Sequence, residues 1–166
     1  RQRQMCIRDR TISGFLASLI PEKYGGAGLP LSAGAVILEE IHKSGGNAAA
    51  CHAQMYTMGT ILRHGSEKQK SNFLPKIASG DLRLQAFGVT EPNSGSDTLS
   101  LKTNAVFNGE KYIINGQKIW TSRAEHSDLL LLLARTKPLE EVKKKTEGIS
   151  GIGIGIGGAY GNCMSV

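Results

Sequence analysis

The spacing of apolar residues changes at Gly80, and the change restricts this chain to folds in which helices precede a sheet. Before Gly80, apolar residues recur at helical intervals, whereas residues 84–90 alternate between apolar and polar in the manner of a strand. Helices followed by strands are typical of the α+β class. We therefore predict mainly helix over residues 11–82 and mainly antiparallel strand over residues 84–135.

Start and stop signals divide the helical part into three helices. The first two are expected over residues 32–44 and 47–64. Ser66 and Gln69 have the spacing of a capping box, which predicts the start of the third helix. Because proline lacks an amide hydrogen and clashes with the preceding turn, we expect Pro75 to break this third helix.

Two Asn-Gly pairs, at residues 108–109 and 115–116, mark turns in the second half of the chain. Asn-Gly is the strongest short hairpin signal, because both central residues of the turn need a positive φ. The pairs predict an antiparallel meander with strands over residues 102–107, 110–114 and 117–122. The apolar run at residues 129–134 predicts a further, buried strand.

The two ends differ in composition from the middle. Residues 1–10 contain four arginines and have no usable period, and residues 151–166 switch to Gly/Ile alternation. We interpret both ends as foreign tails that make few contacts with the rest, which leaves a helical part over residues 11–82 and a β part over residues 83–150. The C-terminal tail spells Gly-x-Gly-x-x-Gly, but it lacks the following helix and acidic residue of a dinucleotide site.

Composition excludes several classes of function. The net charge of +6 is partly concentrated in residues 1–10, and aromatic residues make up only 5% of the chain, so nucleic-acid binding is not expected. The three cysteines and four histidines have no metal-ligand spacing. No apolar stretch reaches the ~18 residues of a membrane helix. The lysine run at residues 143–145 is interpreted as solvated surface.

Residues 87–97 form a strand end followed by a turn of small polar residues. Such a turn presents backbone amides and hydroxyls that suit an anionic or heteroaromatic ligand. A plain surface turn, with a side-chain bond at Ser96 or Asp97, explains these residues equally well. For Trp120 a position in the core is the stronger explanation from the residues alone, because a lone tryptophan on a strand usually belongs to the core.

Four linked motifs favour the ligand-binding interpretation. Residues 90–97 read Thr-Glu-Pro-Asn-Ser-Gly-Ser-Asp, and residues 114–122 read Ile-Asn-Gly-Gln-Lys-Ile-Trp-Thr-Ser. Residues 20–28 read Ile-Pro-Glu-Lys-Tyr-Gly-Gly-Ala-Gly, and residues 65–80 carry the Leu-Pro-Lys segment followed by Gly. In this order and spacing the motifs resemble the acyl-CoA dehydrogenase family, over roughly residues 15–150.

The resemblance implies an N-terminal helical segment and an antiparallel β domain, truncated before a C-terminal helical bundle. It implies FAD as the cofactor and acyl-CoA as the substrate. Ser96 matches a substrate-contacting residue of the family. Thr121 and Ser122 replace the usual Ile-Thr, and Ser122 keeps the hydroxyl. The positions that match flavin-contacting residues are Phe87, Val89, Thr90, Ser96, Trp120, Thr121 and Ser122.

The implied reaction oxidises an acyl-CoA to its trans-2-enoyl form and passes electrons to an electron-transferring flavoprotein. The family's glutamate base lies in the C-terminal helices, so we expect no catalytic residue in this chain, and Glu91 belongs to the flavin loop. The resemblance also implies a homo-oligomer in the bacterial cytoplasm or the mitochondrial matrix. Two alternatives are an acyl-CoA oxidase or flavin monooxygenase of the same fold, and a non-enzymatic interaction module that uses the basic N-terminus.

Overall fold

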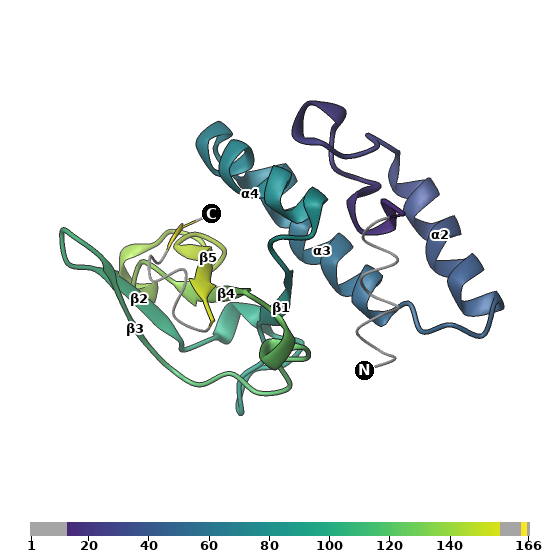
Figure 1. Cartoon of the computed structure of the whole chain (residues 1–166). Helices are drawn as coiled ribbons and strands as arrows, with labels where there is room; N and C mark the ends of the chain where they lie inside the picture. The colour runs from purple at the N-terminus through teal and green to yellow at the C-terminus, as the bar shows by residue number, and fades with distance from the viewer. Residues whose placement is uncertain (1–12, 157–163, 166) are drawn as a thin grey trace. The chain divides into compact units, whose positions relative to one another are not determined.

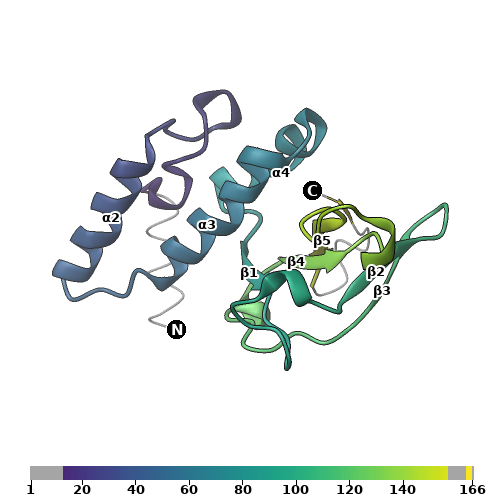
Figure 2. The same cartoon turned by 180° about the vertical axis from the view of Figure 1, so that it is seen from behind.

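The computed structural model describes residues 13–156 and 164–165, with side chains for residues 13–156. The chain divides into two compact units, Arg1–Gln85 and Ala86–Val166. Figures 1 and 2 show helices in the first unit and strands in the second. This arrangement confirms the predicted α+β class. None of the helices in the described part of the chain is both long and apolar enough to span a bilayer.

From residue 13 onward, where the structure describes the chain, the first unit contains three α-helices: α2 (Leu31–Lys43), α3 (Ala49–His64) and α4 (Glu67–Ser79). Short 3-10 turns at Phe15–Ala17 and Glu22–Tyr24 precede them. The core of this unit lies along α3 and α4, because their inward-facing side chains recur at helical spacing and are buried. These buried residues include Cys51, Met55, Met58, Ile61, Phe73, Leu74 and Ile77.

Helix α4 confirms one prediction and corrects another. The Ser66 side chain accepts a hydrogen bond from the Gln69 amide, and the Gln69 side chain accepts one from the Ser66 amide, so the capping box is formed. The expected break at Pro75 is wrong, since the helix continues through it to Ser79. Phe73, Leu74 and Ile77 are buried around the proline, and their burial offsets the one lost backbone hydrogen bond.

The second unit is a mixed sheet of β1 (Leu84–Gly88), β2 (Asn104–Phe107), β3 (Tyr112–Asn115), β4 (Leu129–Arg135), β5 (Ile149–Gly155) and β6 (Met164–Ser165). The strand order is β3-β2-β4-β5-β6, and β1 pairs with β4. The β2–β3, β4–β5 and β5–β6 pairs are antiparallel, whereas β2 and β4 are parallel. Ala105, Leu132, Ala134 and Ile152 form a buried core cluster.

Only the first Asn-Gly pair makes a hairpin. Asn108 and Gly109 connect β2 to β3, and Gly109 takes a φ of 99°. The strand expected over residues 117–122 is wrong, because no strand follows β3 until β4. Trp120 has a φ of 59°, which no β-strand accommodates. Fewer of residues 84–135 lie in strands than expected, because long loops separate the strands.

The expectation that residues 151–166 are a foreign tail is wrong for residues 151–155. They belong to β5, which pairs with β4 from Ile149–Arg135 to Gly155–Leu129. Every second residue of β5 in this stretch is a glycine that lies opposite a leucine of β4, because strand neighbours face each other in register. The Gly/Ile alternation therefore has the two-residue period of a strand, and its glycines leave room for the leucines of β4 that lie opposite. The expectation for residues 1–10 lies outside the described residues.

Candidate functional site

A buried carboxylate, Glu91, holds the turn that follows β1. Glu91 is 6% exposed. Its Oε1 accepts hydrogen bonds from the Thr103 amide at 2.9 Å and from Lys118 Nζ at 2.8 Å. Its Oε2 accepts one from the Lys102 amide at 2.7 Å. One side chain therefore joins the turn after β1, the start of β2 and the segment after β3.

Lys118 makes a second contact with the end of β1. Its Nζ donates to the Val89 carbonyl at 2.9 Å, and its side chain is only 9% exposed. The lysine stem runs past Gly88, where a Cβ atom would lie 3.4 Å from Lys118 Cγ. This distance is an ordinary van der Waals contact. The ammonium group bridges the Val89 carbonyl and the Glu91 carboxylate.

The surroundings of Glu91 fix its charge. Burial raises the pKa of this carboxyl group, but hydrogen bonds from Lys118 and from the amides of Lys102 and Thr103 outweigh it and lower the pKa from 4.5 to about 2. Glu91 is therefore ionised at neutral pH. A carboxylate with so low a pKa is a poor proton acceptor, which agrees with the expectation that Glu91 is not the catalytic base.

The structure brings together two of the segments expected to contact a flavin. Phe87 lies in β1, and Val89 and Thr90 continue from its end. The Ile119 amide donates to the Thr90 carbonyl at 2.9 Å. This hydrogen bond places the segment 119–122 beside the strand end, so Thr90 and Trp120 lie on adjacent stretches of chain.

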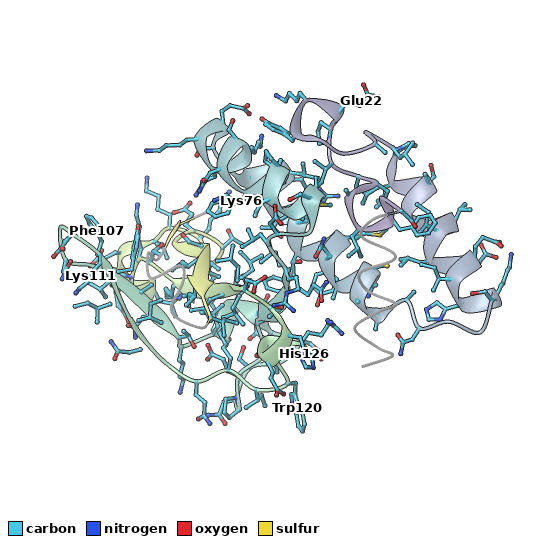
Figure 3. All side chains as sticks on the ribbon, viewed as in Figure 1. Glu22, Lys76, Phe107, Lys111, Trp120 and His126 are labelled. Atoms are coloured by element: carbon cyan, nitrogen blue, oxygen red, sulfur yellow. The ribbon has the colours of Figure 1, made fainter. Side chains whose placement is uncertain are left out.

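Trp120 is not a core residue. It is 85% exposed, and Figure 3 shows it at the margin of the second unit, well away from the hairpin residues Phe107 and Lys111. An indole ring in water leaves a large apolar face uncovered. The plain interpretation of Trp120 as core is therefore excluded within this unit, and the ring is free to pack against a ligand.

The side chains next to Trp120 suit a flat heteroaromatic group. Within residues 13–156, the hydroxyls of Thr90, Thr121 and Ser122 make no hydrogen bond. Free hydroxyls beside an exposed aromatic ring offer both the polar contacts and the stacking surface that a flavin requires. The residues present thus fit an isoalloxazine ring.

Ser96 is placed differently from the other predicted site residues. It is exposed and lies on the turn after Glu91. Ser94 Oγ closes this turn by donating to the Asp97 carbonyl at 2.6 Å, and the Thr98 amide donates to the Ser96 carbonyl at 3.0 Å. In the described chain no hydrogen bond joins Ser96 to the segment 119–122. Ser96 is therefore an outlying position of the candidate site.

Glu91 and Lys118 are the site residues that sequence reasoning missed. Both stand inside the quoted motifs, next to Thr90 and two residues before Trp120 respectively. A signal was present, because one acidic and one basic residue adjoin the two expected flavin segments. Sequence alone gave no reason to pair them across 27 residues, and only the fold brings them into contact.

Comparison with known proteins identifies the family. The model of the acyl-CoA dehydrogenase N-terminal domain matches residues 3–81, and that of the acyl-CoA dehydrogenase middle domain matches residues 86–154. This chain belongs to the acyl-CoA dehydrogenase family. Members of this family are flavin-dependent oxidoreductases. The first match includes most of residues 1–10 and the second includes part of β5, so neither supports a foreign origin for those residues.

Individual relatives agree with the assignment to the acyl-CoA dehydrogenase family. Cyclohex-1-ene-1-carbonyl-CoA dehydrogenase of Syntrophus aciditrophicus is 39% identical over 131 residues, which cover 78% of this chain and 32% of the relative. The structure of an acyl-CoA dehydrogenase from Geobacillus kaustophilus superposes with a TM-score of 0.79 at 33% identity, over 89% of this chain and 38% of that one.

A chain in the solved structure of the electron transferring flavoprotein of Acidaminococcus fermentans is also similar. It has a TM-score of 0.80 at 30% identity, over 93% of this chain and 40% of that one.

This chain of the acyl-CoA dehydrogenase family spans about a third of the length of the curated relatives that it matches.

Proposed function

We propose that residues 87–90 and 120–122 form one wall of the FAD site of an FAD-dependent acyl-CoA dehydrogenase. The observation that carries this proposal is the exposed Trp120 side chain directly after Ile119, whose amide is hydrogen-bonded to the Thr90 carbonyl. Membership of the acyl-CoA dehydrogenase family supports it.

Each side chain of this wall has a distinct task. The Trp120 indole would cover one face of an isoalloxazine ring and exclude water from it. The hydroxyls of Thr90, Thr121 and Ser122 donate hydrogen bonds to the polar edge of the ring. A flavin held at this wall would supply the hydride-accepting chemistry of the oxidation. The protein contributes position and electrostatics to this reaction.

The relatives support a substrate class and an electron acceptor for this proposal. We infer an acyl-CoA thioester as substrate, because the Syntrophus relative is named for a CoA thioester. Ser96, exposed on the turn beyond Glu91, is the residue of this chain that we assign to acyl-CoA contact. The similarity to a chain in the Acidaminococcus structure supports an electron-transferring flavoprotein as acceptor.

The proposal is tested by titrating the apo form of the full-length protein with FAD and following flavin absorbance. We expect one FAD per chain and a perturbed flavin spectrum. Trp120→Ala should weaken binding at least about tenfold, equivalent to ~1.4 kcal/mol, because it removes stacking area. Lys144→Ala, an exposed charge in the lysine run, should change neither quantity. A full-length protein that cannot take up FAD would contradict the proposal.

Oxygen reactivity separates the dehydrogenase from an oxidase or monooxygenase of the same fold. The flavin of the full-length holoenzyme is reduced anaerobically with an acyl-CoA and then mixed with either oxygen or an electron-transferring flavoprotein. A dehydrogenase should be reoxidised rapidly by the flavoprotein and slowly by oxygen. Rapid reoxidation by oxygen would identify the oxidase or monooxygenase instead.

A further inference from the structure

We infer that Lys118 is a positioning residue for the flavin, because its ammonium group fastens the segment that carries Trp120 to the end of β1. This inference rests on the proposed FAD site. It assigns a task to a residue that contacts no substrate or cofactor in that proposal.

The ammonium group of Lys118 has two hydrogen-bond acceptors, one on Val89 and one on Glu91. Nζ donates to the Val89 carbonyl at 2.9 Å and to Glu91 Oε1 at 2.8 Å. With 9% of its side chain exposed, the lysine has almost no water to replace these partners. A buried ammonium that loses its acceptors pays a large desolvation cost. Lys118 is therefore held in one position, in contrast to exposed lysines such as Lys111.

Lys118 and Ile119 together attach two consecutive residues to the strand end. The Lys118 side chain binds Val89 and Glu91, and the Ile119 amide binds the Thr90 carbonyl. The next residue, Trp120, takes a φ of 59° and is 85% exposed. No hydrogen bond within the described residues holds the indole itself. The position of the ring relative to Thr90 is thus set by the anchor that directly precedes it.

Glu91 connects this anchor to the sheet. Its carboxylate also accepts the amides of Lys102 and Thr103, at the start of β2. On the opposite side, Gly116 lies so close to Thr103 that a Cβ atom there would come within 2.6 Å of Thr103 Cα. The segment before Lys118 is therefore also fixed against the sheet. The Lys118–Glu91 ion pair therefore connects the segment that carries Trp120 both to the end of β1 and to the start of β2.

The experiment compares Lys118→Met with Lys111→Met in the full-length protein. Methionine keeps the apolar stem of Lys118 and removes the ammonium group. We expect Lys118→Met to raise the Kd for FAD about tenfold or more and to shift the visible absorption and circular dichroism of the bound flavin. Lys111→Met, on the exposed hairpin turn, should change neither.

If Lys118 only stabilised the fold, Lys118→Met would lower the melting temperature of the protein. The spectrum and the Kd of the bound flavin would then be unchanged below that temperature. If Lys118→Met does not fold, Glu91→Gln decides, because glutamine keeps nearly the same shape but replaces one accepting oxygen by an amide group that donates, beside the donors of Lys118, Lys102 and Thr103. We expect Glu91→Gln to shift the flavin spectrum in the same direction. An unchanged spectrum and Kd in this variant would overturn the inference.

Two failures are distinguishable. A full-length wild-type protein that binds no FAD overturns the proposed function and this inference with it. A wild-type protein that binds FAD, together with a folded Lys118→Met variant of unchanged Kd and flavin spectrum, overturns only the positioning role of Lys118.

Discussion

Backbone strain at Trp120 accompanies its exposure. A non-glycine residue with positive φ costs about 1 kcal/mol or more and persists only where neighbouring contacts enforce it. At Trp120 those contacts are the buried side chain of Lys118 and the amide of Ile119. Arg123, with a φ of 62°, is strained in the same way three residues later. Strain next to an uncovered aromatic ring is typical of ligand sites.

Glu91 predicts a pH dependence of stability. Its pKa is about 2 in the folded protein against 4.5 as the ordinary value. Because the folded pKa is the lower one, the ionised group stabilises the fold above pH 4.5, and this contribution disappears as the pH falls towards 2. One pKa unit corresponds to about 1.4 kcal/mol, so the contribution is about 3 kcal/mol.

The measurement is urea denaturation of the wild type and Glu91→Gln between pH 7 and pH 2. We expect the wild type to be more stable at pH 7 and the two free energies of unfolding to converge near pH 2. Glu110→Gln, which changes an exposed carboxylate of the hairpin turn, is the control. A stability difference between wild type and Glu91→Gln that does not vary with pH would contradict the assignment of the low pKa to Glu91.

At the scale of elements, the two Asn-Gly pairs have different structures for a tertiary reason. Gly109 has open space around it and serves the hairpin turn between β2 and β3. Gly116 packs directly on Thr103, where a Cβ atom would lie 2.3 Å from Thr103 Oγ1. The chain after Gly116 crosses towards Glu91 instead of turning back to form another strand.

Gly116→Ala tests this close approach. We expect it to lower the free energy of unfolding by about 3 kcal/mol or more, because the new methyl group overlaps the Thr103 backbone. Gly109→Ala is the matched control, since Gly109 also has a positive φ but nothing within 4 Å of its Cβ position. It should cost only about 1 kcal/mol of backbone strain. Equal losses in urea denaturation would show that strain alone, and not the contact with Thr103, requires glycine at residue 116.

At the scale of the whole molecule, the chain presents surfaces that its own residues leave uncovered. Helix α2 exposes Leu31 and Val36, and Trp120 is exposed in the second unit. A cavity of about 520 Å³ in the helical unit is lined by side chains of α2 and α3, among them Leu38 and Tyr56. The matched stretch of this chain covers only 32% of a curated relative, so these surfaces belong to less than half of a typical family member.

The isolated chain should bind FAD poorly. We assign to it only one wall of the proposed site, and we expect the remaining contacts to FAD to come from parts of the full-length protein outside this chain. We expect a Kd at least about 100-fold higher for this chain than for the full-length protein, a difference of about 2.7 kcal/mol. Flavin absorbance titrations of both proteins measure it. Tight, stoichiometric binding by the isolated chain would show that one wall suffices.

The sequence by itself determined the features that depend on local chemistry. The capping box at Ser66 and Gln69, the hairpin at Asn108-Gly109 and the strand over residues 129–134 all follow from patterns within a few residues. The motifs around Thr90 and Trp120 likewise pointed to the acyl-CoA dehydrogenase family, because their residues are consecutive in the chain.

Only the tertiary structure decided the features that depend on distant neighbours. The core around Phe73 and Ile77 keeps α4 continuous through Pro75. The leucines of β4 turn a glycine-rich segment into β5, since a strand of glycine gains its stability from the partner that faces it. Lys118 and Glu91 meet because the fold brings β1 beside the segment after β3. Burial and pairing across the chain are collective properties, and no local pattern contains them.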